Sequence, residues 1–319
     1  MTHTHGHPTR VAIIGAGNVG ATFAYSLLIS GLSSEIVLID ANRAKAEGEA
    51  MDLMHAVPLG RPTRVWAGSY EDCAGAAVTV VTAGSAQRPG ETRLDLAARN
   101  TEIFRQIIPS IVSNNPDGML VIATNPVDVL TYASLKISGL PPARVIGSGT
   151  ILDTARFRYL LSQHFDVDPR SVHAFIIGEH GDSEVPVWSL ANLAGMRLPI
   201  YCAANGMQCT SETLTDIFQQ TRDAAYHIIE RKGATYYAIA SGLTRLVEAI
   251  IRDQSTVMSV SSLIRGYYGI DDVCFSLPSV VDGGGVERVI KLELQDDELT
   301  GLRKSADVLK STLHQLKLQ

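Results

Sequence analysis

Three residues near the middle of the chain have side chains suited to proton transfer and carboxylate binding. His180 lies in a glycine-flanked segment, residues 178–182 (GEHGD). Histidine suits general acid–base catalysis because its unperturbed pKa lies near neutrality. Asp153 and Arg156 are three residues apart, so on a helix they would share a face. An aspartate can fix the tautomer of a histidine, and a guanidinium can bind a carboxylate through two hydrogen bonds. Alone, however, the pattern also fits a structural histidine and a surface ion pair.

A glycine-rich segment near the N-terminus has the pattern of a dinucleotide-binding turn. Residues 15–20 (GAGNVG) follow an apolar run and open a helical stretch. In such a turn Gly15 would permit the tight bend, Gly17 would let a pyrophosphate approach the backbone, and Gly20 would allow close helix–strand contact. The free N–H groups at the start of the helix would attract the phosphates.

Asp40 follows Gly20 by twenty residues, at the end of the second apolar run. A carboxylate there can accept hydrogen bonds from ribose hydroxyls and repels a 2′-phosphate, which favours NAD over NADP. The alternative is an ordinary turn residue after a strand. Arg43 and Lys45 are close by in the sequence and would weaken the preference for NAD if they faced the ribose.

The first half of the chain alternates short apolar runs with helical segments, which predicts βαβ units and a parallel sheet buried on both faces. The predicted strands are 11–14, 36–39, 78–81, 119–123 and 144–146, and the predicted helices include 21–29 and 94–113. We therefore expect an α/β fold with a Rossmann-type doubly wound sheet over residues 9–148, preceded by a tail, residues 1–8.

The pattern changes after about residue 148, where the chain becomes mixed α+β. The predicted helices are 152–165, 213–232, a further one ending near 253, and 296–316, and the predicted strands are 172–177, 256–263, 273–281 and 286–294. Residues 282–285 (DGGG) carry a hairpin turn signal. We expect residues 149–319 to form a substrate domain.

Composition excludes several classes of protein. The chain has 319 residues, 45% of them hydrophobic, and a formal charge of −6, so neither disorder nor nucleic-acid binding is favoured. It holds no apolar run of about 18 residues, so we expect no membrane span. The four cysteines form no Cys-x-x-Cys pair, which predicts reduced thiols and a cytoplasmic location. The alternating His3, His5 and His7 are expected to belong to a disordered tail, and no metal site is predicted.

Six further segments occur in one order along the chain: 82–84 (TAG), 87–93 (QRPGETR), 124–128 (TNPVD), 153–156 (DTAR), 178–182 (GEHGD) and 232–235 (KGAT). Together with the glycine-rich turn, they resemble the L-lactate and malate dehydrogenase family from about residue 10 to 316. The resemblance implies hydride transfer between a nicotinamide cofactor and a 2-keto acid, with NAD as the cofactor.

The resemblance also implies a role for each charged residue. His180 would be the general acid, Asp153 its partner, and Arg156 the group that binds the substrate carboxylate. Arg93 would lie on a closing loop and polarise the ketone, as a guanidinium can where negative charge develops. The alternative for Arg93 is an exposed residue at a helix start.

Neutral residues are implied as well. Asn125 would hydrogen-bond substrate and cofactor, unless it is only a turn former, and Thr235 would line the substrate pocket, unless it packs internally. The remaining implied cofactor contacts are Val19, Lys45, Tyr70, Gly84, Ala123 and Ser148.

One loop position separates the two branches of the family. Malate enzymes carry an arginine six residues before the loop arginine, to meet a second carboxylate, and this chain has Gln87 there. A buried second carboxylate without a counter-charge would cost several kcal/mol. Arg88, one residue later, is interpreted as a solvated charge. We therefore expect reversible reduction of pyruvate to L-lactate by NADH, with the L configuration implied by the family alone.

The resemblance implies an effector site and an assembly too. Family members activated by fructose 1,6-bisphosphate carry an arginine and a histidine where this chain has Arg158 and His173. The family usually forms homotetramers. Two alternatives stay open: malate dehydrogenase, and a catalytically silent NAD-binding scaffold protein. The latter should have lost at least one of the four charged residues proposed for catalysis, and all are present.

Overall fold

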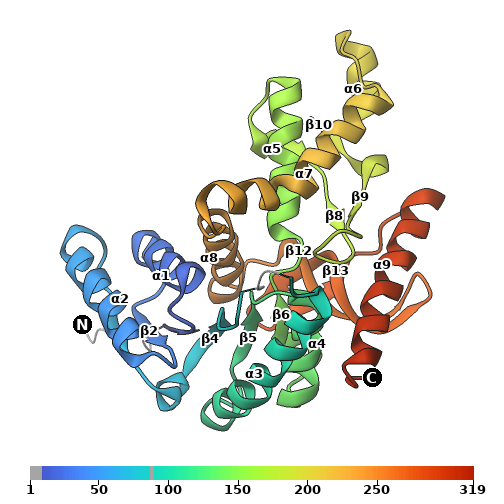
Figure 1. The fold of residues 1–319 in the computed structure, drawn as a ribbon. Coiled ribbons are helices and arrows are strands. Elements are labelled where there is room, and N and C mark those ends of the chain that lie inside the picture. The colour runs from blue at the N-terminus through green and yellow to red at the C-terminus, as the bar shows by residue number, and fades with distance from the viewer. Residues whose placement is uncertain (1–8, 87–89) are drawn as a thin grey trace.

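The computed structural model describes residues 9–86 and 90–319, and its fold is drawn in Figure 1. Gln87 and the three histidines of the tail lie outside the described residues. A nine-stranded sheet in the order β14-β13-β12-β6-β5-β4-β1-β2-β3 runs through the molecule. Its parallel strands are β1 (Arg10–Ile14), β2 (Glu35–Ile39), β3 (Arg64–Ala67), β4 (Ala76–Val81), β5 (Met119–Ile122) and β6 (Val145–Gly147).

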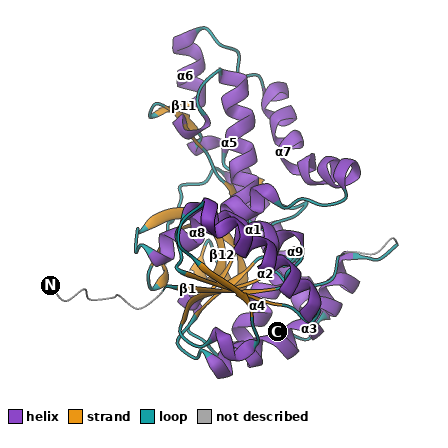
Figure 2. Cartoon of the chain, turned by 90° about the vertical axis from the view of Figure 1, so that its left-hand side faces the viewer, coloured by secondary structure: helices purple, strands orange, loops and turns teal. Residues whose placement is uncertain are grey.

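Helices cover both faces of this parallel region (Figure 2). Alternate residues of a strand face opposite sides, so Ile13 packs with α1 (Asn18–Ser30), α2 (Arg43–Ala56) and α8 (Tyr237–Ile251), whereas Ile14 packs with α3 (Arg93–Asn114) and α4 (Val127–Ser138). Burial on both faces explains why these strands are apolar throughout. The doubly wound α/β fold is confirmed.

The five predicted strands of the first half match β1, β2, β4, β5 and β6 to within two residues. α2, β3 and α4 were not predicted. α2 has a weakly amphipathic sequence with only Ala46, Ala50 and Leu53 buried, so it carries little apolar periodicity. α4 is buried along most of its length, which also hides a helical period.

The second half extends the same sheet with three antiparallel strands, β12 (Thr256–Tyr267), β13 (Ile270–Asp282) and β14 (Gly285–Val289). β12 pairs with β6 where Ser261 faces Gly147, so both halves of the chain share one sheet. The predicted turn is confirmed, because Asp282 pairs with Gly285 across the β13–β14 hairpin. α9 (Asp296–Gln315) packs its apolar face on β12 and β13.

A separate group of helices stands away from the sheet in Figure 2: α5 (Ile151–Phe165), α6 (Leu198–Asn205) and α7 (Ser211–Lys232). They share a small core with the short strands β7 (Val172–His173) and β10 (Asn192–Leu193). A third short strand, β11 (Met196–Arg197), pairs with β10. The 3-10 turns within residues 9–86 and 90–319 are η1 (Val57–Leu59), η2 (Tyr70–Cys73), η3 (Pro142–Arg144), η4 (Pro169–Ser171) and η5 (Trp188–Leu190).

Two predicted strands are corrected. Residues 172–177 form two strands, because β7 pairs with β10 while β8 (Ile176–Ile177) pairs with β9 (Val185–Pro186). Between them the Ala174 carbonyl accepts from Arg158 rather than from a strand. Residues 286–294 are strand only to Val289, since Pro278 on the partner strand has no N–H to continue the ladder.

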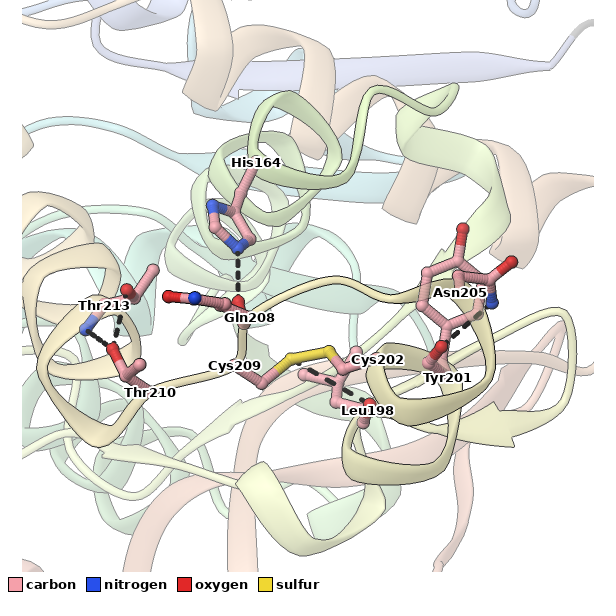
Figure 3. The surroundings of a disulfide bond; sticks show 9 residues. All are labelled: His164, Leu198, Tyr201, Cys202, Asn205, Gln208, Cys209, Thr210 and Thr213. Carbon is pink, nitrogen blue, oxygen red and sulfur yellow. Dashed lines mark hydrogen bonds between the residues drawn. A yellow bond between two sulfur atoms is a disulfide. The ribbon is translucent and has the colours of Figure 1, made fainter.

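The structure contains a disulfide between Cys202 and Cys209, shown in Figure 3, which joins α6 to the segment that leads into α7. Gly206 ends α6 in the left-handed region and turns the chain back, which brings the two Cα atoms to 6.2 Å. The expectation of reduced thiols is therefore wrong for this pair. Cys73 and Cys274 are free and buried.

Within residues 9–86 and 90–319, no helix combines the length and the apolar character needed to cross a membrane.

Candidate active site

The glycine-rich turn joins β1 to α1 at the carboxyl end of the parallel strands, where open α/β sheets bind ligands. Gly15 has φ 105°, and a Cβ on it would lie 2.6 Å from the Ala83 nitrogen. A Cβ on Gly20 would lie 1.9 Å from the Gly15 oxygen, so the helix could not approach the turn. Around Gly17 there is nothing within 4 Å of the Cβ position. The turn thus leaves open space where a pyrophosphate would meet the first turn of α1, which includes Val19.

The Asp40 carboxylate faces this turn. Its Oδ2 accepts from the Ala16 N–H at 2.7 Å and its Oδ1 from the Asn42 N–H at 2.8 Å. Arg43 is turned away, because its guanidinium donates to the Ala67 and Gly68 carbonyls and to Glu47. Arg43 therefore does not face the ribose position beside Asp40, and it should not weaken the preference for NAD.

Two other predicted cofactor residues flank Asp40. Tyr70 opens a short 3-10 turn, and its pKa is raised first by burial and then by the nearby Cys73 and Asp40 side chains. Lys45 is exposed in the first turn of α2, where its backbone N–H donates to the side chain of Asn42.

The loops after β4, β5 and β6 form the next wall of the site. Ala123 and Ser148 are held by backbone hydrogen bonds to Val81 and Ile122. Gly84 lies so close to Thr124 that a Cβ would be 2.3 Å from its methyl group. These contacts place the predicted residues at one edge of the sheet.

Asn100, fully buried on α3, was not predicted and ties these loops together. Its amide accepts from the Ser85 N–H at 2.8 Å and donates to the Asn125 carbonyl at 2.8 Å. The Asn125 side chain itself is exposed beside them, and among the described residues it has no hydrogen-bond partner. Its amide is therefore available to a ligand.

His180, Asp153 and Arg156 form one chain of interactions. The Asp153 carboxylate lies 2.5 Å from His180 Nδ1 through Oδ2 and accepts from Arg156 Nη1 at 2.9 Å through Oδ1. The Asp153 side chain is only 4% exposed, so this is not a surface ion pair. Because Nδ1 is engaged, Nε2 is the ring nitrogen left for a substrate. The structure thus brings together the three side chains that the sequence analysis placed in one site.

Four elements hold the loop that carries His180. The His180 N–H donates to Asp128 on α4 at 2.7 Å, and Asp153 on α5 holds its ring. On either side of it, Gly178 pairs with Ser276 on β13, and the Glu179 N–H donates to Ser305 on α9 at 2.7 Å. The backbone of the loop is thus fixed by two helices and a strand distant in sequence, and the imidazole itself is held by Asp153.

These contacts shift the ionisation of the site. Burial by itself lowers the pKa of His180, but the charge and hydrogen bond of Asp153, with nearby carboxylates, raise the pKa to about 9. Burial opposes ionisation of Asp153 too, yet His180 and Arg156 lower its pKa below the usual value. The pair is therefore an imidazolium beside a carboxylate near neutral pH, ready to give up a proton.

Two buried carboxyl groups beside this pair were not predicted as functional. Burial raises the pKa of Asp128 to about 7, and burial with the charge of Asp153 raises the pKa of Glu184 to about 8. One oxygen of each has no hydrogen-bond partner among the described residues. Asp128 lies inside the segment 124–128 and Glu184 lies two residues after the segment 178–182, but only their burial in the fold sets them apart from other acidic residues.

Arg93 begins α3 and lies against the His180 loop. Its guanidinium is 3.3 Å from Asp182 and 3.9 Å from Glu179, and it donates to the Tyr226 hydroxyl at 3.1 Å. The structure thus brings Arg93, Asp153, Arg156 and His180 together around one loop. Gln87, the predicted substrate selector, lies outside the described residues.

The other predicted residues lie farther from this cluster. Thr235 is half-buried between α7 and α8, and the described residues include no hydrogen bond to it. Arg158 donates to the Ala174 carbonyl at 2.9 Å and lies over Phe175, next to the exposed His173 in β7. In the part of the chain that the structure describes, no three His, Cys, Asp or Glu side chains are grouped to hold a metal ion.

Comparison with known proteins gives two family matches that together span almost all of the chain. Residues 9–147 match the family described as lactate/malate dehydrogenase, NAD binding domain, and residues 150–318 match its alpha/beta C-terminal domain.

Individual proteins are similar over the same length. The chain is 52% identical over 310 residues to an L-lactate dehydrogenase of Acetivibrio thermocellus, covering 97% of this chain and 98% of that protein. It is 53% identical over 305 residues to L-lactate dehydrogenase 2 of Bacillus cereus, covering 95% and 97%. Among solved structures, the minor L-lactate dehydrogenase of Enterococcus mundtii in a ligand-bound form superposes with a TM-score of 0.95 at 42% identity, covering 98% of this chain and 99% of that one.

Proposed function

The chain belongs to the lactate/malate dehydrogenase family, and from this premise we propose that it catalyses the NAD-dependent, reversible reduction of pyruvate to L-lactate with His180 as the general acid. The observation that carries the proposal is the buried chain of interactions from Arg156 through Asp153 to His180. It joins a group that can bind a carboxylate, Arg156, to a proton donor, His180. Reduction of a 2-keto acid requires both, one for the carboxylate and one for the keto oxygen.

In the proposed mechanism Arg156 binds the pyruvate carboxylate with the part of its guanidinium that Asp153 does not use. Arg93 faces the keto oxygen, and Asn125 donates a hydrogen bond beside it. His180 gives its Nε2 proton to that oxygen as negative charge develops there. Asp153 keeps the imidazole in one tautomer and stabilises its cation. Thr235 would line the pocket for the substrate methyl group.

The residues around the glycine-rich turn fit NAD. The open position at Gly17, the first turn of α1 and the Asp40 carboxylate would hold the pyrophosphate and the ribose. Val19, Lys45, Tyr70, Gly84, Ala123, Asn125 and Ser148 complete the proposed cofactor site. Bound NADH supplies the hydride that is added to the keto carbon. We assign this part to residues 9–148 and the substrate side to 149–319.

A regulatory site for fructose 1,6-bisphosphate at Arg158 and His173 is a further part of the proposal. Arg158 donates to the carbonyl of Ala174, the residue that follows His173, so its guanidinium lies beside the backbone from which the His173 side chain starts. Arg158 forms no ion pair with a described carboxylate, which leaves its charge available for a phosphate.

We also propose a homotetramer and a cytoplasmic location. Exposed apolar side chains gather on α1, α2 and the turn after them, and they would be covered in an assembly: Tyr25, Ile29, Met51, Met54 and Leu59. The free thiols of Cys73 and Cys274 fit a reducing compartment, whereas the Cys202–Cys209 disulfide does not.

One assay tests the proposal: steady-state reduction of a panel of 2-keto acids by NADH, with and without fructose 1,6-bisphosphate. We expect kcat/KM for pyruvate to exceed that for oxaloacetate by about a hundredfold or more, because the second carboxylate lacks a counter-charge. Gln87→Arg should shift the preference to oxaloacetate, and the matched control Arg88→Gln should leave it unchanged. A wild-type preference for oxaloacetate would make the protein a malate dehydrogenase.

The effector arm of the assay uses pyruvate below saturation. Fructose 1,6-bisphosphate should lower the apparent KM for pyruvate, and His173→Ala should remove that response. An unchanged apparent KM in the wild type would contradict the regulatory site and leave the catalytic proposal standing.

A further inference from the structure

Arg93, Asp182 and Tyr226 form a closed triangle of polar contacts between three separate elements. Arg93 Nη2 donates to the Tyr226 hydroxyl at 3.1 Å and lies 3.3 Å from Asp182 Oδ2. The Tyr226 hydroxyl donates to the other oxygen of Asp182 at 3.0 Å. Arg93 begins α3, Asp182 follows His180 by two residues, and Tyr226 lies on α7. Each member therefore contacts the other two.

Gly181 makes this arrangement possible. A Cβ at Gly181 would lie 2.8 Å from Arg93 Nη1, so the guanidinium rests on the backbone of the residue next to His180. Any larger residue would push the guanidinium away from the loop. The contact therefore sets how close Arg93 comes to the imidazole.

The three side chains are about half exposed, at 51% for Arg93, 62% for Asp182 and 52% for Tyr226. Exposed pairs of this kind add little to folding stability, because water screens the charges. Their effect is instead on conformation. A long arginine side chain has many rotamers. The contacts of Arg93 with Tyr226, Asp182 and the backbone at Gly181 restrict it to one region before substrate arrives.

We propose that Tyr226 and Asp182 are positioning residues that hold the Arg93 guanidinium against the His180 loop, where it meets the keto oxygen of the substrate. This inference rests on the proposed roles of Arg93 and His180. Tyr226 provides an uncharged acceptor and, through its own donated hydrogen bond, fixes the Asp182 carboxylate. Asp182 provides the charge that draws the guanidinium to this place. Neither residue contacts the reacting atoms.

The test is Tyr226→Phe, which removes the hydroxyl and keeps the ring. Since Arg93 would act where charge develops in the transition state, we expect kcat with pyruvate to fall about three- to tenfold. The affinity for NADH, measured by fluorescence, and the melting temperature should stay at wild-type values. The matched control is Tyr159→Phe on α5, a tyrosine of similar exposure at 54%, which should change none of these quantities. Asp182→Asn should lower kcat in the same direction.

A mutant cycle separates positioning from a general effect on the loop. In an Arg93→Gln background, Tyr226→Phe should cause no further loss, because there is no guanidinium left to position. Independent, multiplying losses would overturn the positioning role, and so would a raised kcat in Tyr226→Phe, which would mean that the triangle restrains Arg93 from the substrate. A fully active Arg93→Gln variant would instead overturn the proposed role of Arg93 and this inference with it.

Discussion

The cofactor side and the proton-transfer side of this molecule are built in different ways. The cofactor side is mainly a matter of backbone shape, with glycines where a Cβ would collide at Gly15 and Gly20 and open space at Gly17. The proton-transfer side is a cluster of charged side chains, in which Asp153 is buried between His180 and Arg156. Shape set by backbone does not respond to pH, whereas a cluster of coupled charges does. Substitutions on the proton-transfer side should therefore lower kcat and change its pH dependence, whereas substitutions on the cofactor side should raise the KM for NADH.

The largest effect is expected on the proton-transfer side. His180→Ala removes the proton donor, and we expect kcat for pyruvate reduction to fall by about a thousandfold or more, while NADH still binds. Stopped-flow or steady-state absorbance of NADH measures the rate, and fluorescence titration measures binding. His55→Ala, an exposed histidine on α2, is the matched control and should keep full activity. Undiminished pyruvate reduction by His180→Ala would show that another group donates the proton.

A smaller effect, of a different kind, is expected on the cofactor side. Asp40→Ala should raise the KM for NADH by about tenfold, since hydrogen bonds to a charged acceptor are lost. Discrimination against NADPH should weaken as well, and the KM for pyruvate should stay unchanged. Asp52→Ala, an exposed carboxylate on α2, is the control. If Asp40→Ala changed the KM for pyruvate rather than for NADH, the separation of the two sides would be wrong.

The same contrast explains what the sequence predicted. The glycine-rich turn and Asp40 span only residues 15–40, so their spacing carries the geometry directly. The role of His180 was predicted from motifs that are spread along the chain. The spacing of those motifs does not show that Asp153, Arg156 and Arg93 lie around His180, which only the structure shows. The positioning of Arg93 by Tyr226 was not predicted, since Tyr226 lies 133 residues from Arg93.

Other features escaped prediction for local reasons. The segment 172–177 has the composition of one strand, but Arg158 takes the Ala174 carbonyl and the segment divides between two sheets. The approach of Cys202 to Cys209 depends on how α6 ends, which cysteine spacing does not reveal. Asp128 and Glu184 are ordinary acidic residues until the fold buries them. In each case a contact between separate elements decides the outcome.

The central claim is that Asp153 holds His180 as a proton donor, and the pH dependence of kcat/KM in the wild type and in Asp153→Asn tests it most directly. The pKa of His180 is raised to about 9, so wild-type pyruvate reduction should be full at neutral pH and decline as pH rises through about 9. Lactate oxidation, which needs the neutral imidazole, should rise over the same interval. In Asp153→Asn, burial is no longer offset by this charge, so the decline should move to lower pH. A decline at the same pH in both proteins would contradict the account.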